Sequence, residues 1–168
     1  MTTSRTDELT VRYAGPEDVD TLVDFSAAMA KETEGRALDR ERLRRGTLAV
    51  FESPDRGFYL VAEVGQGAGR QVVGQLLVTY EWSDWRNATF WWIQSVYVHP
   101  AWRRRGVYRR LHETVLQWAR ERKDVCGIRL YVEGENRIAQ AAYVRAGLAP
   151  SSYRVFEQDF VLPRGEPE

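Results

Sequence analysis

The spacing of apolar residues changes repeatedly along the chain, and each change predicts a switch between strand and helix. Apolar runs and alternating apolar positions, which are typical of strands, occupy residues 9–13, 58–64, 71–80, 89–98, 127–132 and 153–160. Spacing typical of an amphipathic helix begins near residue 16 and returns over about residues 39–49, 107–123 and 136–146. The predicted order is strand, two helices, three strands, helix, strand, helix, strand. This order predicts an α/β protein (an α+β mixed sheet) with helices on both faces.

Turn-forming residues support these boundaries. Pro16 suits the first turn of a helix, and Gly147 suits the residue that closes one. The glycine-rich residues 65–70 predict a hairpin loop between two strands. The following run, 71–80, is nearly continuous in apolar residues and is therefore expected at the centre of the sheet. Residues 81–88 are polar and aromatic, and we expect them to interrupt the strands on either side.

Length, charge and cysteine content restrict the class of protein. A chain of 168 residues predicts a single domain over 1–168, with flexible tails at 1–7 and 163–168. The 24 basic and 24 acidic residues cancel, which argues against a nucleic-acid-binding protein. No apolar run resembles a signal peptide or a membrane span, and the single cysteine allows no internal disulfide. We therefore expect a cytoplasmic protein that binds no membrane, and two histidines leave too few ligands for a metal site.

One stretch, residues 91–111, organises the chain. It reads as a buried strand, a basic turn, and the start of an amphipathic helix at Gly106. Free N–H groups and the positive end of the helix dipole make such a start an anion site. The arginines at 103–105 and 109–110 add positive charge, so the turn predicts a pocket for a phosphorylated ligand.

Two motifs give this pocket a family resemblance. Residues 103–108 read Arg-Arg-Arg-Gly-Val-Tyr, and residues 136, 139, 143 and 147 are Asn, Ala, Tyr and Gly. The first pattern resembles the acyl-CoA pyrophosphate loop of the GCN5-related N-acetyltransferase (GNAT) family, with Tyr108 in place of a small residue. The second resembles the family motif Asn-x-x-Ala-x-x-x-Tyr-x-x-x-Gly-Phe, with Leu148 in place of the phenylalanine. The order of elements resembles the family over residues 9–162.

The resemblance implies a GNAT-like fold and acetyl-CoA as the cofactor. The fold would have a mostly antiparallel, twisted central sheet, splayed at the strand that holds the acyl-CoA. A bulge on that strand is expected at Gln94–Ser95. Pantetheine would lie along the strand and the pyrophosphate on the basic turn. The cofactor-binding residues implied are Val96, Tyr97, Val98, Arg103, Arg104, Arg105, Gly106, Val107, Tyr108, Arg109, Asn136 and Tyr143.

The implied reaction is direct transfer of the acetyl group to a primary amine of a small molecule or peptide, within a ternary complex. The backbone N–H near Val98 would stabilise the oxyanion, and the Tyr143 hydroxyl would protonate the leaving thiolate. An alkylammonium, with a pKa of about 10.4, must first lose a proton. The central strand has no carboxylate near Gln94, so the base stays open. We favour Glu81 or Glu133 acting through water over Asp84 and His99.

An acceptor wall is expected before the central strand. Two tryptophans, Trp82 and Trp85, alternate there with acids, among them Asp84. Aromatic rings and carboxylates suit a cationic amine, and Gln94 and Glu32 are further candidates for contact with the acceptor. The same tryptophans also fit a packed corner or a contact between two copies in a homodimer.

Each motif residue also has a plain structural explanation. Asn136 is a good helix cap, Tyr143 fits a helical core stripe, and an arginine-rich helix start is often just solvated. A non-catalytic acyl-CoA-binding or regulatory module on the same fold therefore remains the alternative to an enzyme. Binding of nucleic acid by the arginine cluster is disfavoured by the neutral net charge.

Overall fold

The computed structural model describes residues 8–163, and the chain divides after Glu133 into two units that are treated separately below. The tails expected to be flexible, 1–7 and 163–168, lie outside the described residues apart from Pro163. The expectation of one domain stays a prediction. Among residues 8–163, no helix has both the length and the apolar character needed to cross a membrane.

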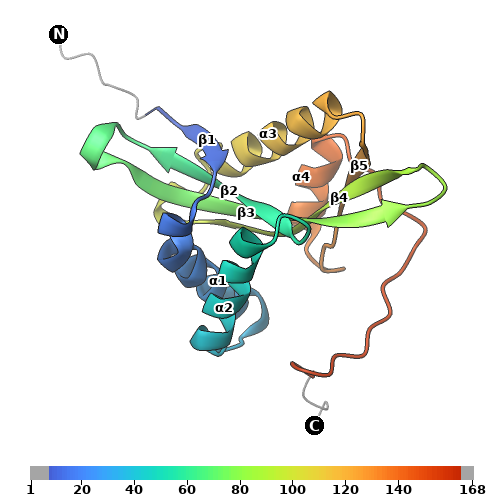
Figure 1. The fold of residues 1–168 in the computed structure, drawn as a ribbon, viewed down its shortest axis with the longest axis horizontal. Helices are drawn as coiled ribbons and strands as arrows, with labels where there is room; N and C mark the ends of the chain where they lie inside the picture. Colours follow the sequence, from blue (N-terminus) through green and yellow to red (C-terminus); the bar gives the residue numbers. More distant parts are fainter. Residues whose placement is uncertain (1–7, 164–168) are drawn as a thin grey trace. The chain divides into compact units, whose positions relative to one another are not determined.

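The first unit is a five-stranded sheet with helices on both faces (Figure 1). Its strands lie in the order β1-β2-β3-β4-β5, with every neighbouring pair antiparallel except β4 and β5, which are parallel. The predicted mixed, mostly antiparallel sheet is thereby confirmed. The strands are β1 (Thr10–Tyr13), β2 (Gly57–Val64), β3 (Gln71–Ser83), β4 (Ala88–Val98) and β5 (Val125–Leu130). The helices are α1 (Val19–Glu34), α2 (Arg40–Glu52) and α3 (Val107–Glu121).

Local sequence signals set the helix ends. Pro16 lies in a short 3-10 turn that leads into α1, and Gly35, in the left-handed conformation with φ 63°, ends that helix. The Asp39 side chain accepts a hydrogen bond from the Arg42 N–H at 2.8 Å and so caps α2. These caps agree with the helix starts that the sequence predicts.

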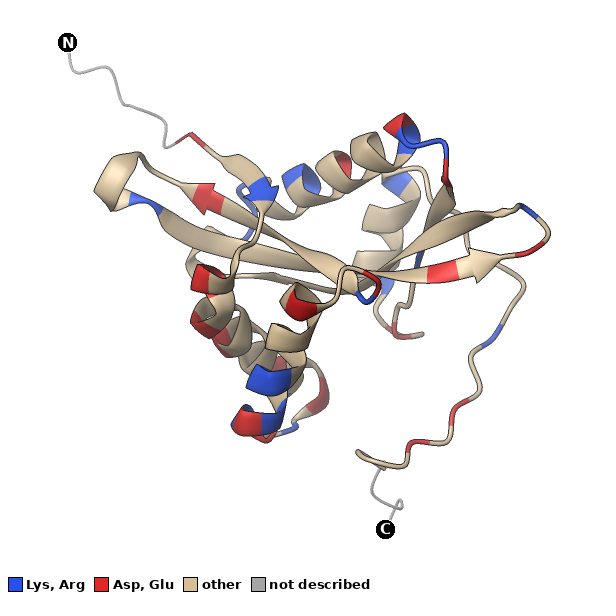
Figure 2. Cartoon of the chain, in the orientation of Figure 1, with Lys and Arg blue, Asp and Glu red and all other residues tan. Residues whose placement is uncertain are grey.

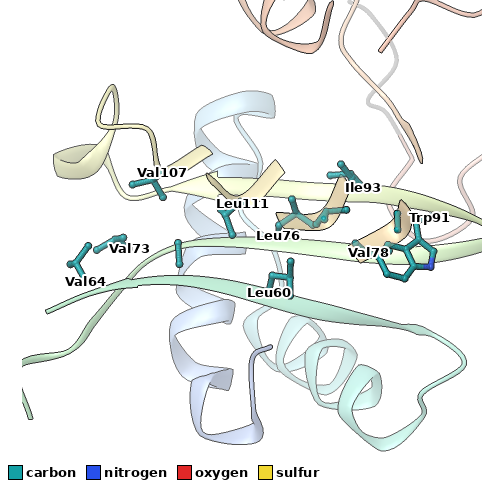
Figure 3. Close-up of a cluster of buried hydrophobic side chains, with 12 residues drawn as sticks. Leu60, Val64, Val73, Leu76, Val78, Trp91, Ile93, Val107 and Leu111 are labelled. Carbon is teal, nitrogen blue, oxygen red and sulfur yellow. The ribbon is translucent and has the colours of Figure 1, made fainter. Parts of the chain in front are cut away.

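The core has one layer on each side of the sheet. On one face, α3 inserts its buried residues Leu111, Val115 and Ala119 against the strands. Their partners on β2, β3 and β4 are Leu60, Ala62, Leu76, Val78, Trp91 and Ile93. Figure 3 shows Leu111 beside Leu76 in this layer. On the other face α1 and α2 cover Tyr59 and Val61 with Leu22, Val50 and Phe51. Each fully buried leucine contributes about 1.5–3 kcal/mol to folding, so the two layers hold the sheet between them.

The strands β4 and β5 part in the middle of β4. Pairing between them ends at Ile93 and Leu130, whereas β4 stays paired with β3 to Val98. At the same place β4 carries a bulge, because Ser95 pairs with Leu77 and Ile93 with Val78 while Gln94 is left over. The splay and the bulge expected at Gln94–Ser95 are both present.

Two strand predictions within this unit need correction. The expected interruption at 81–88 is wrong, because Glu81–Ser83 pair with Ala88–Phe90 and the hairpin extends to a four-residue tip. Polar residues fit there because this part of the hairpin is largely exposed, and Asn87 adopts φ 47° in the tip, as asparagine tolerates. The strand expected at 127–132 is shifted and runs from Val125 to Leu130.

The second unit begins at Gly134 and contains α4 (Arg137–Arg145). The Asn136 side chain caps it by accepting from the Ala139 N–H at 3.1 Å. Gly147, with φ 94°, closes it. The strand predicted at 153–160 is wrong, since residues 151–163 form no strand. Apolar side chains alone do not make a strand, because its backbone also needs a hydrogen-bonded neighbour.

Candidate active site

The open edge of β4 presents backbone groups with no strand beside them. The His99 N–H donates to Val73 O at 2.9 Å, toward β3. Because successive residues of a strand face opposite neighbours, the N–H and C=O groups of Val96 and Val98 point to the open side. The predicted contact of Val96 and Val98 with pantetheine therefore fits the strand geometry. The backbone of Tyr97 faces β3 instead, and its part in binding stays a prediction.

The basic turn ends at a helix start shaped for an anion. Gly106 adopts φ 80° and ψ 7°, and a β-carbon there would meet no atom within 4 Å. The first hydrogen bond of α3 runs from Arg110 N–H to Gly106 O, at 2.9 Å. The N–H groups of Val107 and Arg109 consequently have no partner within the helix. The space over the glycine and these donors fit the pyrophosphate of an acyl-CoA.

The arginines of this turn are not equivalent. Arg103 pairs with Glu32 at 2.7 Å and Arg109 pairs with Glu113 at 2.7 Å. Within residues 8–163, Arg104 and Arg105 have no ion pair, and Arg105 stacks over Trp102 at 4.9 Å. These two guanidinium groups therefore carry positive charge that no carboxylate of the described residues neutralises by an ion pair. The Tyr108 ring packs along α3, 6.0 Å from the ring of His112.

A carboxylate from α1 reaches the cofactor end of β4. Glu32 accepts hydrogen bonds from the Tyr97 hydroxyl at 2.9 Å and from Arg103 at 2.7 Å. Arg103 also donates to the carbonyl of Val98 at 3.0 Å, on the open edge. The Arg103 hydrogen bond and then the Tyr97 hydrogen bond lower the pKa of Glu32. Burial, and then Glu32, raises the pKa of Tyr97. Glu32, predicted as an acceptor contact, therefore lies beside the cofactor turn.

The surface beside the point where β4 and β5 part consists of aromatic and polar side chains. We call Trp92, Tyr131 and Gln94 the wall. The Trp92 and Tyr131 rings lie 4.5 Å apart, and Tyr131 is 53% exposed. Gln94, in the bulge, donates to the Thr79 hydroxyl at 2.8 Å and is exposed. The opposite face of the sheet is covered by α3, so these side chains line the face that α3 leaves uncovered.

A second carboxylate cluster borders the wall. Glu81 accepts from the Trp92 indole N–H at 2.8 Å and from Arg129. Arg129 extends from β5 across β4, with its guanidinium carbon 3.7 Å from the centre of the Phe90 ring. Glu81 is thus held beside the wall. It belongs to the segment 81–88, which was expected to interrupt the strands but is paired in the sheet as far as Ser83.

The hairpin tip lies apart from the splay. Trp82 pairs with Thr89, which is about 17 Å along the strand from Gln94. Trp82 and Trp85 are 62% and 85% exposed, and Asp84 caps the Trp85 N–H at 2.9 Å. A small acceptor at the bulge would not reach these residues, although a peptide would. Their predicted role as an acceptor wall stays untested.

The remaining chemical candidates fall in different places. His99 accepts from the Ala101 N–H at 3.1 Å and shapes the basic turn. Glu133 ends the first unit, and Tyr143 and Asn136 belong to the second. Tyr143 lies in α4, where Asn136 is the cap. The roles predicted for Glu133 and Tyr143 remain predictions.

Sequence reasoning missed Arg129 and Tyr131. Charged residues are sparse on the strands (Figure 2), so a single arginine inside the apolar run 127–132 was an available signal. The alternation of side chains along a strand also indicates that Arg129 and Tyr131 lie on the face opposite Ile128 and Leu130. The sequence could not show that Arg129 reaches Glu81, since the two lie on different strands.

Comparison with known proteins agrees with this geometry. The profile of the acetyltransferase (GNAT) family matches residues 21–148. The structure of a possible acetyltransferase from Clostridium difficile 630 is similar, with 38% identity, TM-score 0.83, and coverage of 92% of this chain and 99% of that chain. No curated protein matches in sequence.

Two more distant structures share the fold. Aminoglycoside N-acetyltransferase AAC(6')-Iy, solved with CoA, has 14% identity, TM-score 0.74, and coverage of 95% of this chain and 100% of that chain. An aminoglycoside acetyltransferase, meta-AAC0020, from an uncultured soil metagenomic sample was solved with sisomicin. It has 15% identity, TM-score 0.65, and coverage of 92% and 96%. At these identities the similarity is one of fold.

Proposed function

Because the chain belongs to the acetyltransferase (GNAT) family, we propose that it transfers the acetyl group of acetyl-CoA to a primary amine of a small molecule or peptide. One observation carries the proposal: β4 parts from β5 at a bulge, on the same strand that leads into the glycine start of α3. This arrangement supports a site in which a cofactor arm lies along β4 and its phosphates lie on α3. That similar structures include one solved with CoA also supports it.

Acetyl-CoA supplies the thioester, and the residues of the chain orient it. The backbone groups of Val96 and Val98 hold the arm, and the N–H groups at Val107 and Tyr108 hold the pyrophosphate. Arg104 and Arg105 add charge-assisted hydrogen bonds. The Val98 N–H, on the open edge, is the donor for the oxyanion.

The acceptor amine approaches over Trp92 and Tyr131 and attacks the carbonyl carbon directly. A C–N bond forms, the C–S bond breaks, and the sulfur leaves as a thiolate that takes the proton of the Tyr143 hydroxyl. The nitrogen of the new amide loses its second proton, which restores the Tyr143 hydroxyl by way of solvent. Before attack, the ammonium gives a proton to a water held by Glu81. Each Glu81 oxygen already accepts one hydrogen bond and retains a lone pair for that water. Glu133 is the second candidate for this step.

A transfer assay tests the proposal. Acetyl-CoA and a panel of primary amines should yield acetylated amine and free thiol in equal amounts. Tyr143→Phe should lower kcat about 100-fold, because the leaving thiolate loses its acid, with the Kd for CoA nearly unchanged. Unchanged turnover would remove Tyr143 from the acid role without affecting the rest of the proposal.

A non-catalytic acyl-CoA-binding module is the second candidate. It is favoured by the bulge, where Gln94 stands in place of a carboxylate, and by the engagement of both nearby carboxylates with arginines. Tight CoA binding without transfer to any amine would establish this alternative.

A further inference from the structure

The charged residues within the five strands form two ion pairs. They are Arg12 with Glu63, at 3.0 Å, and Arg129 with Glu81. A charge placed in a sheet loses hydration and is retained only where other contacts compensate. The two pairs are compensated to very different degrees, and this difference indicates what each does.

The Arg12 pair is complete in itself. Arg12 donates four hydrogen bonds: one to Glu63, two to Asp18 and one to the carbonyl of Tyr13. Glu63 also meets Arg70 at 3.3 Å, and both carboxylates are buried. With its guanidinium surrounded by acceptors, Arg12 ties β1, β2 and the start of α1 together, so it is a structural arginine.

Arg129 is held firmly but is not satisfied. Within residues 8–163 it donates hydrogen bonds to Glu81 alone, and its face lies on the Phe90 ring at 3.7 Å. Its side chain is 34% exposed, almost the same as the 35% of Arg12. A guanidinium carries several N–H donors in a planar fork. One edge of the Arg129 fork is therefore anchored, while the other is open to a ligand.

The residues around Arg129 support its guanidinium group and fix its direction. Gly127 lies opposite Phe90, and a β-carbon at Gly127 would come within 2.8 Å of that ring. The absence of a side chain thus leaves room for the ring that supports the guanidinium. Glu81, fixed in turn by the Trp92 indole, sets the direction of the fork.

The location of the fork is next to the splay. Arg129 pairs with Trp92, two positions before the bulge residue Gln94, or about 7 Å along the strand. Paired residues share a face of the sheet, so Arg129 lies on the face that carries Trp92 and Tyr131. An acceptor amine at the bulge would hold its neighbouring substituents within reach of Arg129.

We propose that Arg129 is a subsite for a carboxylate of the acceptor, and that the acceptor is an amino acid or another amine bearing a carboxylate close to the amino group. The planar fork binds such a group through two parallel hydrogen bonds. Glu81 balances the charge of the fork when no acceptor is bound. This inference rests on the proposed acetyl transfer and specifies its substrate class.

Paired acceptors test the inference. Amino acids are compared with the amines that result from their decarboxylation, such as phenylalanine with phenethylamine. The acid member should have kcat/KM about tenfold or more above its partner. Arg129→Gln should abolish this preference by lowering kcat/KM for the acids alone, and Arg129→Lys should restore part of it.

The matched control is Arg86→Gln. Arg86 also stacks on Phe90, at 4.9 Å, but from the hairpin tip, where it donates a hydrogen bond to the Ser83 hydroxyl. This variant removes the same charge from the same ring and should keep the preference for acids. Equal kcat/KM for both members of each pair, or an equal loss for both in Arg129→Gln, would overturn the inference.

A binding measurement separates this inference from the proposed reaction. 3-Phenylpropionate has the acid and the ring but no amine to acetylate. By calorimetry it should bind the wild type and bind Arg129→Gln about tenfold more weakly, whether or not any amine is acetylated. Failure of transfer with retained acid binding would refute only the reaction. Absence of acid binding by the wild type would refute the subsite.

Discussion

Two clusters of the same chemical composition lie along β4, one at each side of the splay. At the cofactor side, Glu32 bridges Arg103 and the Tyr97 hydroxyl. At the acceptor side, Glu81 bridges Arg129 and the Trp92 indole. In both, the guanidinium also lies over a ring, at 5.3 Å for Tyr97 and 3.7 Å for Phe90.

The clusters differ in what holds their members. Glu32 lies near the end of α1 and Arg103 lies in a turn, and their side chains are 41% and 44% exposed. Exposed pairs of this kind contribute about 0–1 kcal/mol, so Arg103 can exchange Glu32 for a phosphate at little cost. Glu81 and Arg129 belong to strands, and the sheet fixes their backbone. A carboxylate, a guanidinium and an aromatic donor therefore make a releasable contact in one place and a preformed one in the other.

The sharpest test of this contrast is a change that removes the cofactor side alone. Gly106→Glu places a negative charge and a left-handed non-glycine residue at the phosphate site. The Kd for CoA should rise on the order of 100-fold or more, since repulsion between the new carboxylate and the phosphates costs about 3 kcal/mol. Binding of 3-phenylpropionate at the acceptor side should stay unchanged.

The control is Gly67→Glu in the loop between β2 and β3. Gly67 has φ 55° and, like Gly106, no atom within 4 Å of a built β-carbon. It carries comparable strain and charge away from the basic turn, so calorimetry should show wild-type CoA affinity. Retained affinity in Gly106→Glu would show that the phosphate site lies elsewhere.

The features of the basic turn are local in the sequence, whereas the cluster at the other side of the splay is not. The basic turn and Gly106 are local features that were predicted from neighbouring residues, whereas the bulge at Gln94, which β4 does carry, was implied by the family resemblance. The Glu81–Arg129 cluster joins β3 to β5 across β4, and no local spacing encodes a pairing of that kind. The strand predicted at 153–160 failed for the same reason, since pairing depends on residues far away in the chain.

A second test exploits the acceptor side. Glu81→Gln keeps the size of the side chain but removes the charge that anchors Arg129 and the base proposed for the water. We expect kcat/KM for the acceptor to fall about tenfold or more, as when a charge-assisted hydrogen bond is lost. The Kd for CoA, measured in the same preparation, should not move. A loss of CoA affinity of similar size would mean that the two clusters are coupled rather than independent.

The corresponding change at the cofactor side should have the opposite sign. Glu32→Gln releases Arg103 from a competing carboxylate, so the Kd for CoA should fall about two- to fivefold, the scale of an exposed ion pair. Glu34→Gln is the matched control, because it removes the same charge from the same region. Glu34 pairs with Arg36, at 3.4 Å, and not with Arg103. Weaker CoA binding in Glu32→Gln would show that Glu32 positions Arg103 for the cofactor instead of competing for it.

The pH range in which the two clusters can be compared depends on a third residue, His112 in α3. It is 2% exposed, neither ring nitrogen has a hydrogen-bond partner within residues 8–163, and burial lowers the pKa of His112. The unfolded chain, with a histidine pKa of about 6.5, then binds the proton more readily than the folded one. This contribution to stability is complete above that pH and declines as the pH falls toward the lowered pKa of the folded state.

Scanning calorimetry between pH 8 and pH 5 should show Tm falling in the wild type and falling less in His112→Leu, while His99→Asn should follow the wild type. Equal slopes in all three would mean that the acid sensitivity arises at groups other than His112.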